Sequence, residues 1–331
     1  MAKVIPEPLH KFLGADTTIF TLTQNNKTVI YDLTVPPRQV DGFYTTSTNY
    51  TYALTFSFEE EFEVRDYTGW MRYNWWQALV WIAIYVTFIF VGQNYMRERP
   101  RYELRKALFL WNTVLAIFST FGAIRTVPEV LHLIKDYGFG FTCCISGKPF
   151  LDNRVGGFWN WMFTLSKVPE LGDTVFIVLR KQPLIFLHWY HHVTVLLYAW
   201  YSYSDYIATA RWFVCMNYLV HSIMYSYYAL KALKFRVPRW VAMGITTAQL
   251  LQMVMGAAVN IWAYQVKQAG NECHVSYDNI KISLLMYTSY FVLFARFFRR
   301  AYVLKDKEAP ATKKGQESLA YEGKSSKGKM E

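Results

Sequence analysis

Long apolar runs fill most of the chain from residue 74 onward, and short charged links separate them. A helix needs about 20 mostly apolar residues to cross a bilayer. Seven runs reach this length and show too little amphipathicity for buried helices of one soluble core. They predict an all-α, polytopic membrane protein with seven transmembrane helices, over residues 74–94, 107–133, 156–179, 183–203, 209–230, 240–265 and 276–303.

The distribution of Lys and Arg predicts how these helices are oriented. The links after the first, third and fifth runs hold eleven Lys and Arg residues, whereas the links after the second, fourth and sixth hold four. Lys and Arg favour cytosolic links. We therefore expect a luminal N-terminus and a cytosolic C-terminus. The net charge of +11 fits an anionic membrane surface better than nucleic acid, because the charge lies between apolar runs.

The chain divides into three predicted regions. Residues 1–73 form a luminal segment without the apolar core of a cleavable signal peptide, and the alternation over 17–58 predicts short strands. Residues 74–303 form the membrane domain. Residues 304–331 are polar and poor in aromatics, which predicts a disordered cytosolic tail.

Two further features agree with this topology. Asn26 and Asn49 begin glycosylation sequons in the luminal segment. Lys327 and Lys329 resemble the dilysine retrieval signal of endoplasmic-reticulum membrane proteins, which acts in the cytosol. The protein is therefore expected in that membrane.

Cysteines in the predicted luminal links allow a disulfide. Cys273 has two possible partners, Cys143 and Cys144, and the pair Cys144–Cys273 is taken as the candidate. Cys215 lies inside the fifth run and is expected to be an ordinary core residue. The cysteines do not have the paired CxxC spacing of a metal site.

The third to sixth predicted helices carry ionisable and amide side chains, which are costly in a bilayer and mark function. One such residue in each helix lies ten positions from a basic residue at the predicted cytosolic surface. These four residues are Glu170, His191, His221 and Gln249. At about 15 Å of depth each, they predict one shared polar site.

Histidines dominate this level. His188, His191 and His192 follow an i, i+3, i+4 spacing and share one helix face. A di-iron site of the desaturase type needs more histidines than the seven present. A single zinc ion and a purely structural role are alternatives, but we expect no metal. Imidazole as base or nucleophile toward a thioester explains the set best. The absence of a Gly-rich nucleotide motif argues against a nicotinamide-dependent reductase.

Four motifs in successive predicted helices carry a family resemblance. They are KVPELGDT from Lys167, HWYHH from His188, HSIMYSYY from His221 and TTAQLLQ from Thr246. The region around 72–302 resembles the very-long-chain fatty acid elongase family. Stretches such as LRKQPLIFLHWYHH are similar to the subgroup that acts on saturated and monounsaturated long chains.

The resemblance implies a 3-oxoacyl-CoA synthase that joins acyl-CoA and malonyl-CoA and releases CoA and carbon dioxide. It implies that helices two to seven form a barrel around an acyl tunnel, and that the acyl group passes through an imidazole of His191. His221 would assist as orienting base or oxyanion partner, and Glu170 and Asp173 would fix imidazole tautomers. The implied catalytic residues are Glu170, Asp173, His188, His191, His192 and His221, and the implied substrate-binding residues are Lys167, Asn217, Tyr225, Gln249 and Gln252.

Further expectations concern partners and rival functions. No cofactor is expected beyond the two substrates, and the pathway implies a ketoreductase, a dehydratase and an enoyl reductase as partners. A seven-span receptor or transporter is one alternative, which the predicted retrieval signal disfavours. An inactive acyl-binding subunit is another, which the intact HWYHH motif disfavours. Chain-length preference depends on the side chains that close the luminal end of the tunnel.

Overall fold

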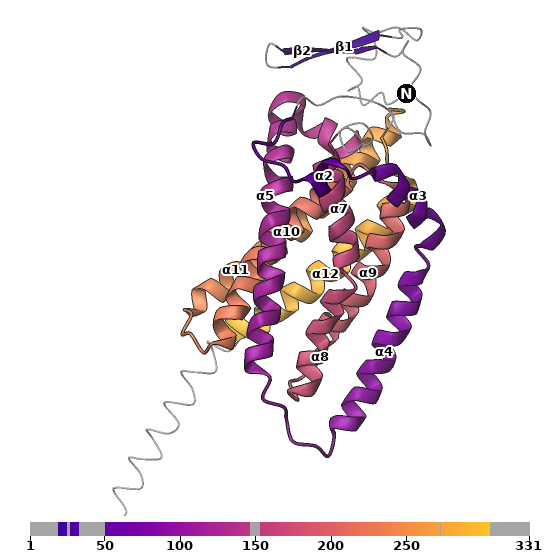
Figure 1. Cartoon of the computed structure of the whole chain (residues 1–331). Coiled ribbons are helices and arrows are strands. Elements are labelled where there is room, and N and C mark those ends of the chain that lie inside the picture. Colours follow the sequence, from indigo (N-terminus) through magenta and orange to yellow (C-terminus); the bar gives the residue numbers. More distant parts are fainter. Residues whose placement is uncertain (1–18, 25–26, 33–49, 146–152, 272, 305–331) are drawn as a thin grey trace, which may run out of the picture.

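The computed structural model describes residues 19–24, 27–32, 50–145, 153–271 and 273–304, which form a bundle of long helices with small elements at one end (Figure 1). The predicted sequons at Asn26 and Asn49 and the predicted retrieval residues Lys327 and Lys329 lie outside these ranges. The long helices are α4 (Gln77–Met96), α5 (Arg105–Cys144), α9 (Phe186–Asp205), α10 (Ala210–Ala232), α11 (Arg239–Gln268) and α12 (Tyr277–Phe298).

Shorter elements complete the description. They are β1 (Ile19–Gln24), β2 (Lys27–Asp32), α2 (Ser57–Glu60), α3 (Val64–Asn74), α7 (Arg154–Ser166), the 3₁₀ turn η1 (Pro169–Leu171), α8 (Gly172–Leu179) and the π-helix η2 (Arg299–Leu304). The strands pair as an antiparallel hairpin, with Ile19 opposite Asp32. The hairpin lies in the region where alternation predicted strands, whereas α2 and α3 were not predicted.

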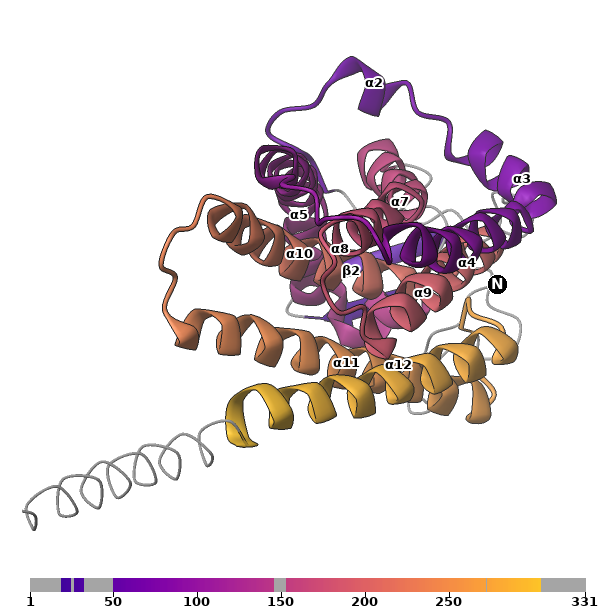
Figure 2. The same ribbon diagram turned by 90° about the horizontal axis from the view of Figure 1, so that it is seen from below.

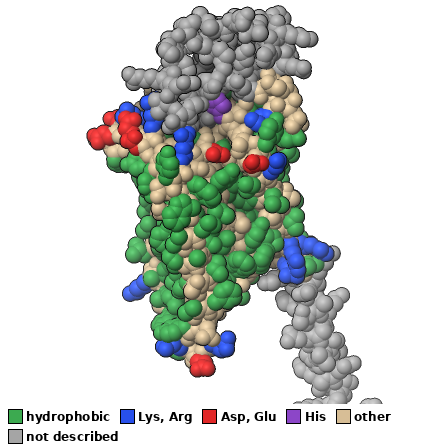
Figure 3. Space-filling model, turned by 90° about the vertical axis from the view of Figure 1, so that its right-hand side faces the viewer, with side chains coloured by type: hydrophobic (Ala, Val, Ile, Leu, Met, Phe, Trp, Pro, Cys, Tyr) green, Lys and Arg blue, Asp and Glu red, His purple; other side chains and the backbone are tan. Residues whose placement is uncertain are grey.

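Among the described residues, four helical segments are long and apolar enough to cross a membrane: Gln77–Met96, Arg105–Cys144, Arg239–Gln268 and Tyr277–Leu304. The face shown in Figure 3 agrees with this finding, because apolar side chains cover its middle and charged side chains gather toward its two ends. An uncharged middle between charged ends is what a bilayer selects. The described part of the chain is thus an all-helical, polytopic membrane protein apart from the hairpin.

The prediction of one continuous third helix over 156–179 is wrong. Helix α7 ends at Ser166, and the turn η1 connects it to α8. Pro169 has no amide hydrogen, so it cannot donate to the carbonyl of Leu165 and continue the α7 hydrogen bonds. The amide of Val168 donates to that carbonyl instead, at 3.1 Å. The break places Lys167, Glu170 and Asp173 around one tight turn.

The helix α5 also contains a break, at Gly138, whose φ of 83° lies outside the helical region. The short segment that follows ends at Cys144, which forms a disulfide with Cys273 across 129 residues of sequence. The structure thereby selects one of the two partners that the sequence left open. The amide of His274 donates to the carbonyl of Cys144 at 2.9 Å, so the two connections are also joined through their backbones.

Six helices contact one another in a closed order. From α5 the contacts pass to α10, α11, α12, α9 and α7, and α7 returns to α5. Figure 2 shows α4 to one side of this group, beside α8 and α9, the two helices it packs against. We call the end of the bundle formed by the links 97–104, 180–185 and 233–238 the basic end, because these links hold Lys and Arg residues.

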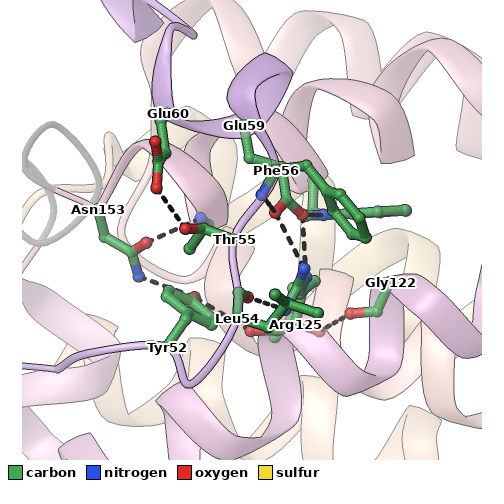
Figure 4. A network of polar contacts seen from close by, with 12 residues as sticks. Tyr52, Leu54, Thr55, Phe56, Glu59, Glu60, Gly122, Arg125 and Asn153 are labelled. Carbon is green, nitrogen blue, oxygen red and sulfur yellow. Dashed lines mark hydrogen bonds and ion pairs between the residues drawn. The ribbon is translucent and has the colours of Figure 1, made fainter.

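The opposite end is covered by residues 50–63, which we call the anchor segment, and by α3. Glu59 of this segment is fully buried, and Arg125 of α5 donates to its carboxylate from Nε at 2.9 Å and from Nη2 at 3.0 Å. Figure 4 shows Arg125 pointing from α5 toward Glu59 and the backbone of Leu54, whose carbonyl accepts from Nη1 at 2.7 Å. Tyr52 donates to the carbonyl of Arg125 at 3.1 Å. The anchor segment is therefore fixed to the bundle by buried polar contacts.

Candidate active site

Two cavities meet inside the bundle. The outer cavity, of about 370 Å³, lies between α8, α9, α10 and α11 and extends to Ile185 and Tyr302 at the basic end. The inner cavity, of about 50 Å³, is narrow and extends the other way, to Tyr203, Tyr206 and Ile207. Residues that line both cavities mark the junction, and they are His191, Asn217, Gln252 and Met253.

The outer cavity gathers the residues that sequence analysis selected. All of the predicted catalytic residues line it, and so do all of the predicted substrate-binding residues except Lys167. The four residues predicted to share one depth, Glu170, His191, His221 and Gln249, are among them. The walls of the inner cavity differ, because they are mainly aromatic and aliphatic side chains of α9, α10 and α12.

Lys167 lies behind the wall of the outer cavity and binds two of the residues that line it. Its side chain is 2% exposed, and its ammonium donates to Oε1 of Glu170 at 2.7 Å and to Oδ1 of Asn217 at 3.1 Å. Ser166 donates to the same carboxylate oxygen at 2.9 Å. The charge of Lys167 is thus paired and hydrogen-bonded, as a buried charge must be.

This contact determines the tautomer of His221. A lysine ammonium only donates, so the amide of Asn217 must turn its oxygen to Lys167 and its nitrogen to His221. The distance from Asn217 Nδ2 to His221 Nε2 is 3.0 Å. Nε2 of a neutral His221 is therefore the acceptor, and its proton resides on Nδ1. This relay, the two hydrogen bonds that run from Lys167 through Asn217 to His221, leaves His221 with an N–H group that can donate to a substrate.

Asp173 is held by two aromatic side chains. Trp111 Nε1 donates to Oδ1 at 2.6 Å, and the hydroxyl of Tyr225 donates to Oδ2 at 2.9 Å. Trp111 approaches so closely because residue 172 is glycine, where a Cβ atom would lie 2.7 Å from the indole ring. Among the described residues, neither Asp173 nor Glu170 forms a hydrogen bond with an imidazole. The expectation that these carboxylates fix histidine tautomers is therefore wrong: Asn217 and Thr174 bind the imidazoles instead.

A second relay reaches the site from α4. Thr174 Oγ1 lies 2.9 Å from Nε2 of His188 and 2.8 Å from the hydroxyl of Tyr85. Tyr85 and Thr174 are both buried. Sequence analysis missed Tyr85 because a single tyrosine in an aromatic-rich apolar run gives no signal of its own. The helix α4, which lies outside the closed order of six, thus reaches the imidazole of His188 in the candidate site through the hydroxyls of Tyr85 and Thr174.

The remaining two histidines differ in their surroundings. Nδ1 of His192 is buried and, within the described part of the chain, has no hydrogen-bond partner. The ring of His191 lies against Tyr290, with ring centroids 5.0 Å apart, and makes no hydrogen bond to another described residue. His191 is half-buried and lines both cavities, so a ligand in either cavity can reach its nitrogens.

Amide and aromatic groups form the side of the outer cavity toward α11. Gln249 Nε2 lies 3.3 Å from the sulfur of Met224, a weak acceptor, and Gln252 is buried at the junction. Nearer the basic end, Arg239 donates to the carbonyls of Ala301 and Tyr302 at 3.1 and 3.2 Å. The described residues contain no group of three or more His, Cys, Asp or Glu side chains placed to hold a metal ion.

The fold and the site together define a class of protein. It is a polytopic helical membrane protein in which a histidine-lined cavity leads into a narrow apolar cavity. The model of the ELO: GNS1/SUR4 family matches residues 70–310, which include every site residue described above. The chain therefore belongs to the ELO: GNS1/SUR4 family.

The chain is similar to fatty acid elongases of several animals. Very long chain fatty acid elongase 6 of Drosophila melanogaster is 53% identical over 254 residues, which cover 76% of this chain and 80% of that protein. Its namesake from Homo sapiens is 49% identical over 250 residues, covering 76% and 93%. Putative fatty acid elongase 3 of Caenorhabditis elegans is 45% identical over 263 residues, covering 80% and 82%. The resemblance found in the sequence motifs is confirmed.

Proposed function

We propose that this protein is the condensing enzyme of fatty acid elongation, which joins a long-chain acyl-CoA and malonyl-CoA through an acyl group carried by His191. The observation that carries the proposal is the position of His191: it lines both cavities, and its ring nitrogens make no hydrogen bond to another described residue. The narrow apolar cavity suits an acyl chain, and the wide polar one suits CoA. The imidazole lies where the thioester would join them.

The reaction then proceeds in two steps. A ring nitrogen of His191 attacks the thioester carbonyl, the carbon–sulfur bond breaks, and CoA leaves as the thiol after taking up a proton. Malonyl-CoA next loses carbon dioxide, and the carbanion that forms attacks the acyl-imidazole. The carbon–nitrogen bond breaks and gives 3-oxoacyl-CoA, and the released imidazole nitrogen takes up a proton from water, which restores neutral His191.

The hydrogen-bond relays suggest roles for the neighbours of His191. We assign His221 the role of a donor, through Nδ1–H, to the oxyanion that forms in both steps. Asn217 and Lys167 act as positioning residues, because they determine the tautomer of His221. His188 and His192 shape the site, with Thr174 and Tyr85 orienting His188. Tyr225, Gln249 and Gln252 line the cavity proposed for CoA and malonyl-CoA.

We further propose a topology and a location for this domain. The closed order of six helices would form a barrel around the acyl tunnel, with α4 as an additional span, giving seven. The basic end would face the cytosol, so that CoA phosphates meet the Lys and Arg residues of its links. The anchor segment and the sequons Asn26 and Asn49 would then face the lumen of the endoplasmic reticulum. The ketoreductase, dehydratase and enoyl reductase of the cycle would act on the product at the cytosolic side of this membrane.

The test is condensation by the purified protein, supplied with palmitoyl-CoA and radiolabelled malonyl-CoA without a reductant. The expected product is labelled 3-oxostearoyl-CoA. His191→Ala should abolish it, whereas His132→Ala, which changes a histidine outside both cavities, should retain it. A well-folded protein that gives no product with any acyl-CoA of a chain-length series would refute the proposal.

A further inference from the structure

The end of the inner cavity that lies away from the outer cavity is lined by aromatic side chains. Tyr203 and Tyr206 line it at the end of α9, with ring centroids 5.7 Å apart. Tyr206 has a φ of 49°, in the left-handed region that a bulky side chain rarely adopts. Such a conformation persists only where the surrounding structure holds it. What packs behind the two tyrosines therefore determines where the cavity ends.

The helix α3 packs behind this wall. Val64 and Met71 of α3 are fully buried and share one apolar cluster with Tyr203 and Tyr206. Trp161 connects the two layers, since its ring lies 5.2 Å from that of Tyr203 and 5.1 Å from that of Tyr67. Tyr203 cannot move outward, away from the cavity, unless α3 also moves.

The anchor segment, in turn, holds α3 in place through Glu59. Besides the two bonds from Arg125, this carboxylate accepts from Trp159 Nε1 at 2.6 Å and from the amide of Phe56 at 3.0 Å. Arg125 belongs to α5 and Trp159 to α7, so one buried carboxylate ties the anchor segment to two helices. Four residues separate Glu59 from Val64, the first residue of α3, which leaves α3 little freedom to move while Glu59 is bound.

We infer that the anchor segment and α3 limit the length of the acyl chain, with Glu59 and Met71 as specificity-determining residues that act from behind the cavity wall. The inference rests on the proposed function. Each round of condensation adds two carbons, and a longer chain fits only if Tyr203 and Tyr206 yield. A close-packed wall resists this displacement. Loosening the anchor or removing volume behind the wall lets longer chains enter without a change in the residues that touch substrate.

The test compares condensation rates with stearoyl-CoA and palmitoyl-CoA, each paired with radiolabelled malonyl-CoA. Glu59→Gln keeps the shape of the side chain but removes its charge, and Met71→Ala empties space behind Tyr203 without disturbing a buried charge. Glu61→Gln is the matched control, because Glu61 is an exposed carboxylate in the same segment. The stearoyl-to-palmitoyl ratio should rise on the order of tenfold in the first two variants, the discrimination that a hydrophobic pocket achieves per methylene. It should stay at the wild-type value in Glu61→Gln.

Two outcomes would overturn the inference, and they are distinguishable. An unchanged ratio in Met71→Ala and in Glu59→Gln, with palmitoyl-CoA still condensed, would show that the anchor segment serves stability alone. Failure of the wild-type protein to condense palmitoyl-CoA would refute the proposed function and this inference with it. If Glu59→Gln does not fold, Met71→Ala decides the question, because its change leaves the buried ion pair intact.

Discussion

The ion pair of Lys167 and Glu170 lends itself to a quantitative prediction. The two groups are 2.7 Å apart and their side chains are 2% and 5% exposed. Lys167→Met removes the cation at nearly constant volume and leaves the carboxylate buried with Ser166 as its remaining partner. Removing one partner of a buried pair costs about 3–5 kcal/mol. For a domain of this size that corresponds to a fall in unfolding temperature of about 6–20 °C.

The chain provides a matched control for this change. Lys281 and Asp278 form another pair with three-residue spacing, at 3.3 Å, but their side chains are 71% and 75% exposed. Because water screens an exposed pair, Lys281→Met should cost at most about 1 kcal/mol. The double variant Lys167→Met with Glu170→Gln removes the unpaired charge, so it should be more stable than Lys167→Met alone. It should still fall about 1–3 kcal/mol short of the wild type, since Asn217 Oδ1 has lost its donor.

The assay is thermal unfolding of the detergent-solubilised protein, followed by tryptophan fluorescence. Unfolding temperatures of Lys167→Met and Lys281→Met that agree within a degree or so would refute the destabilisation assigned to the unpaired carboxylate of Glu170. So would a double variant that is less stable than Lys167→Met, because the loss would then not arise from an unpaired carboxylate.

Three further predictions follow from other contacts. Asn217→Leu removes the donor to His221 and should lower condensation up to about 100-fold with little change in the KM for palmitoyl-CoA; an unchanged rate would contradict the relay. Cys144→Ser opens a cross-link over 129 residues and should cost roughly 4–5 kcal/mol of unfolding free energy; equal unfolding temperatures of the variant and the wild type would contradict this. Glycosidase treatment should shift the electrophoretic mobility of the wild type but not of Asn26→Gln with Asn49→Gln, and no shift in the wild type would argue against a luminal N-terminus.

Sequence patterns predicted the location of the site better than the hydrogen bonds between its residues. Counting residues from basic links placed Glu170, His191, His221 and Gln249 at one depth, and these four line one cavity. Depth follows from helical rise and from the cost of burying charge, both of which are local properties of the sequence. Lateral contacts are not local, so the partners of each group could not be predicted in the same way.

The acidic residues illustrate this limit. Their proximity to histidines in the sequence suggested carboxylate–imidazole contacts, but Asp173 binds Trp111 and Tyr225. Trp111 lies 62 residues earlier in the chain, and Gly172 allows its ring to approach. Such a contact depends on how α5 packs against α8, which apolar periodicity does not encode. The break in the third predicted helix, by contrast, has a cause that is visible in the sequence, because Pro169 ends the hydrogen bonds of α7.

The most direct test of the central claim is the mass of the intact protein after brief incubation with palmitoyl-CoA alone, quenched in acid. We expect a gain of one palmitoyl group with release of one equivalent of CoA, and no gain in His191→Ala. Malonyl-CoA, added before the quench, should discharge the modified protein to 3-oxostearoyl-CoA. A palmitoyl adduct that persists in His191→Ala, or condensation at the wild-type rate by that variant, would show that His191 does not carry the acyl group.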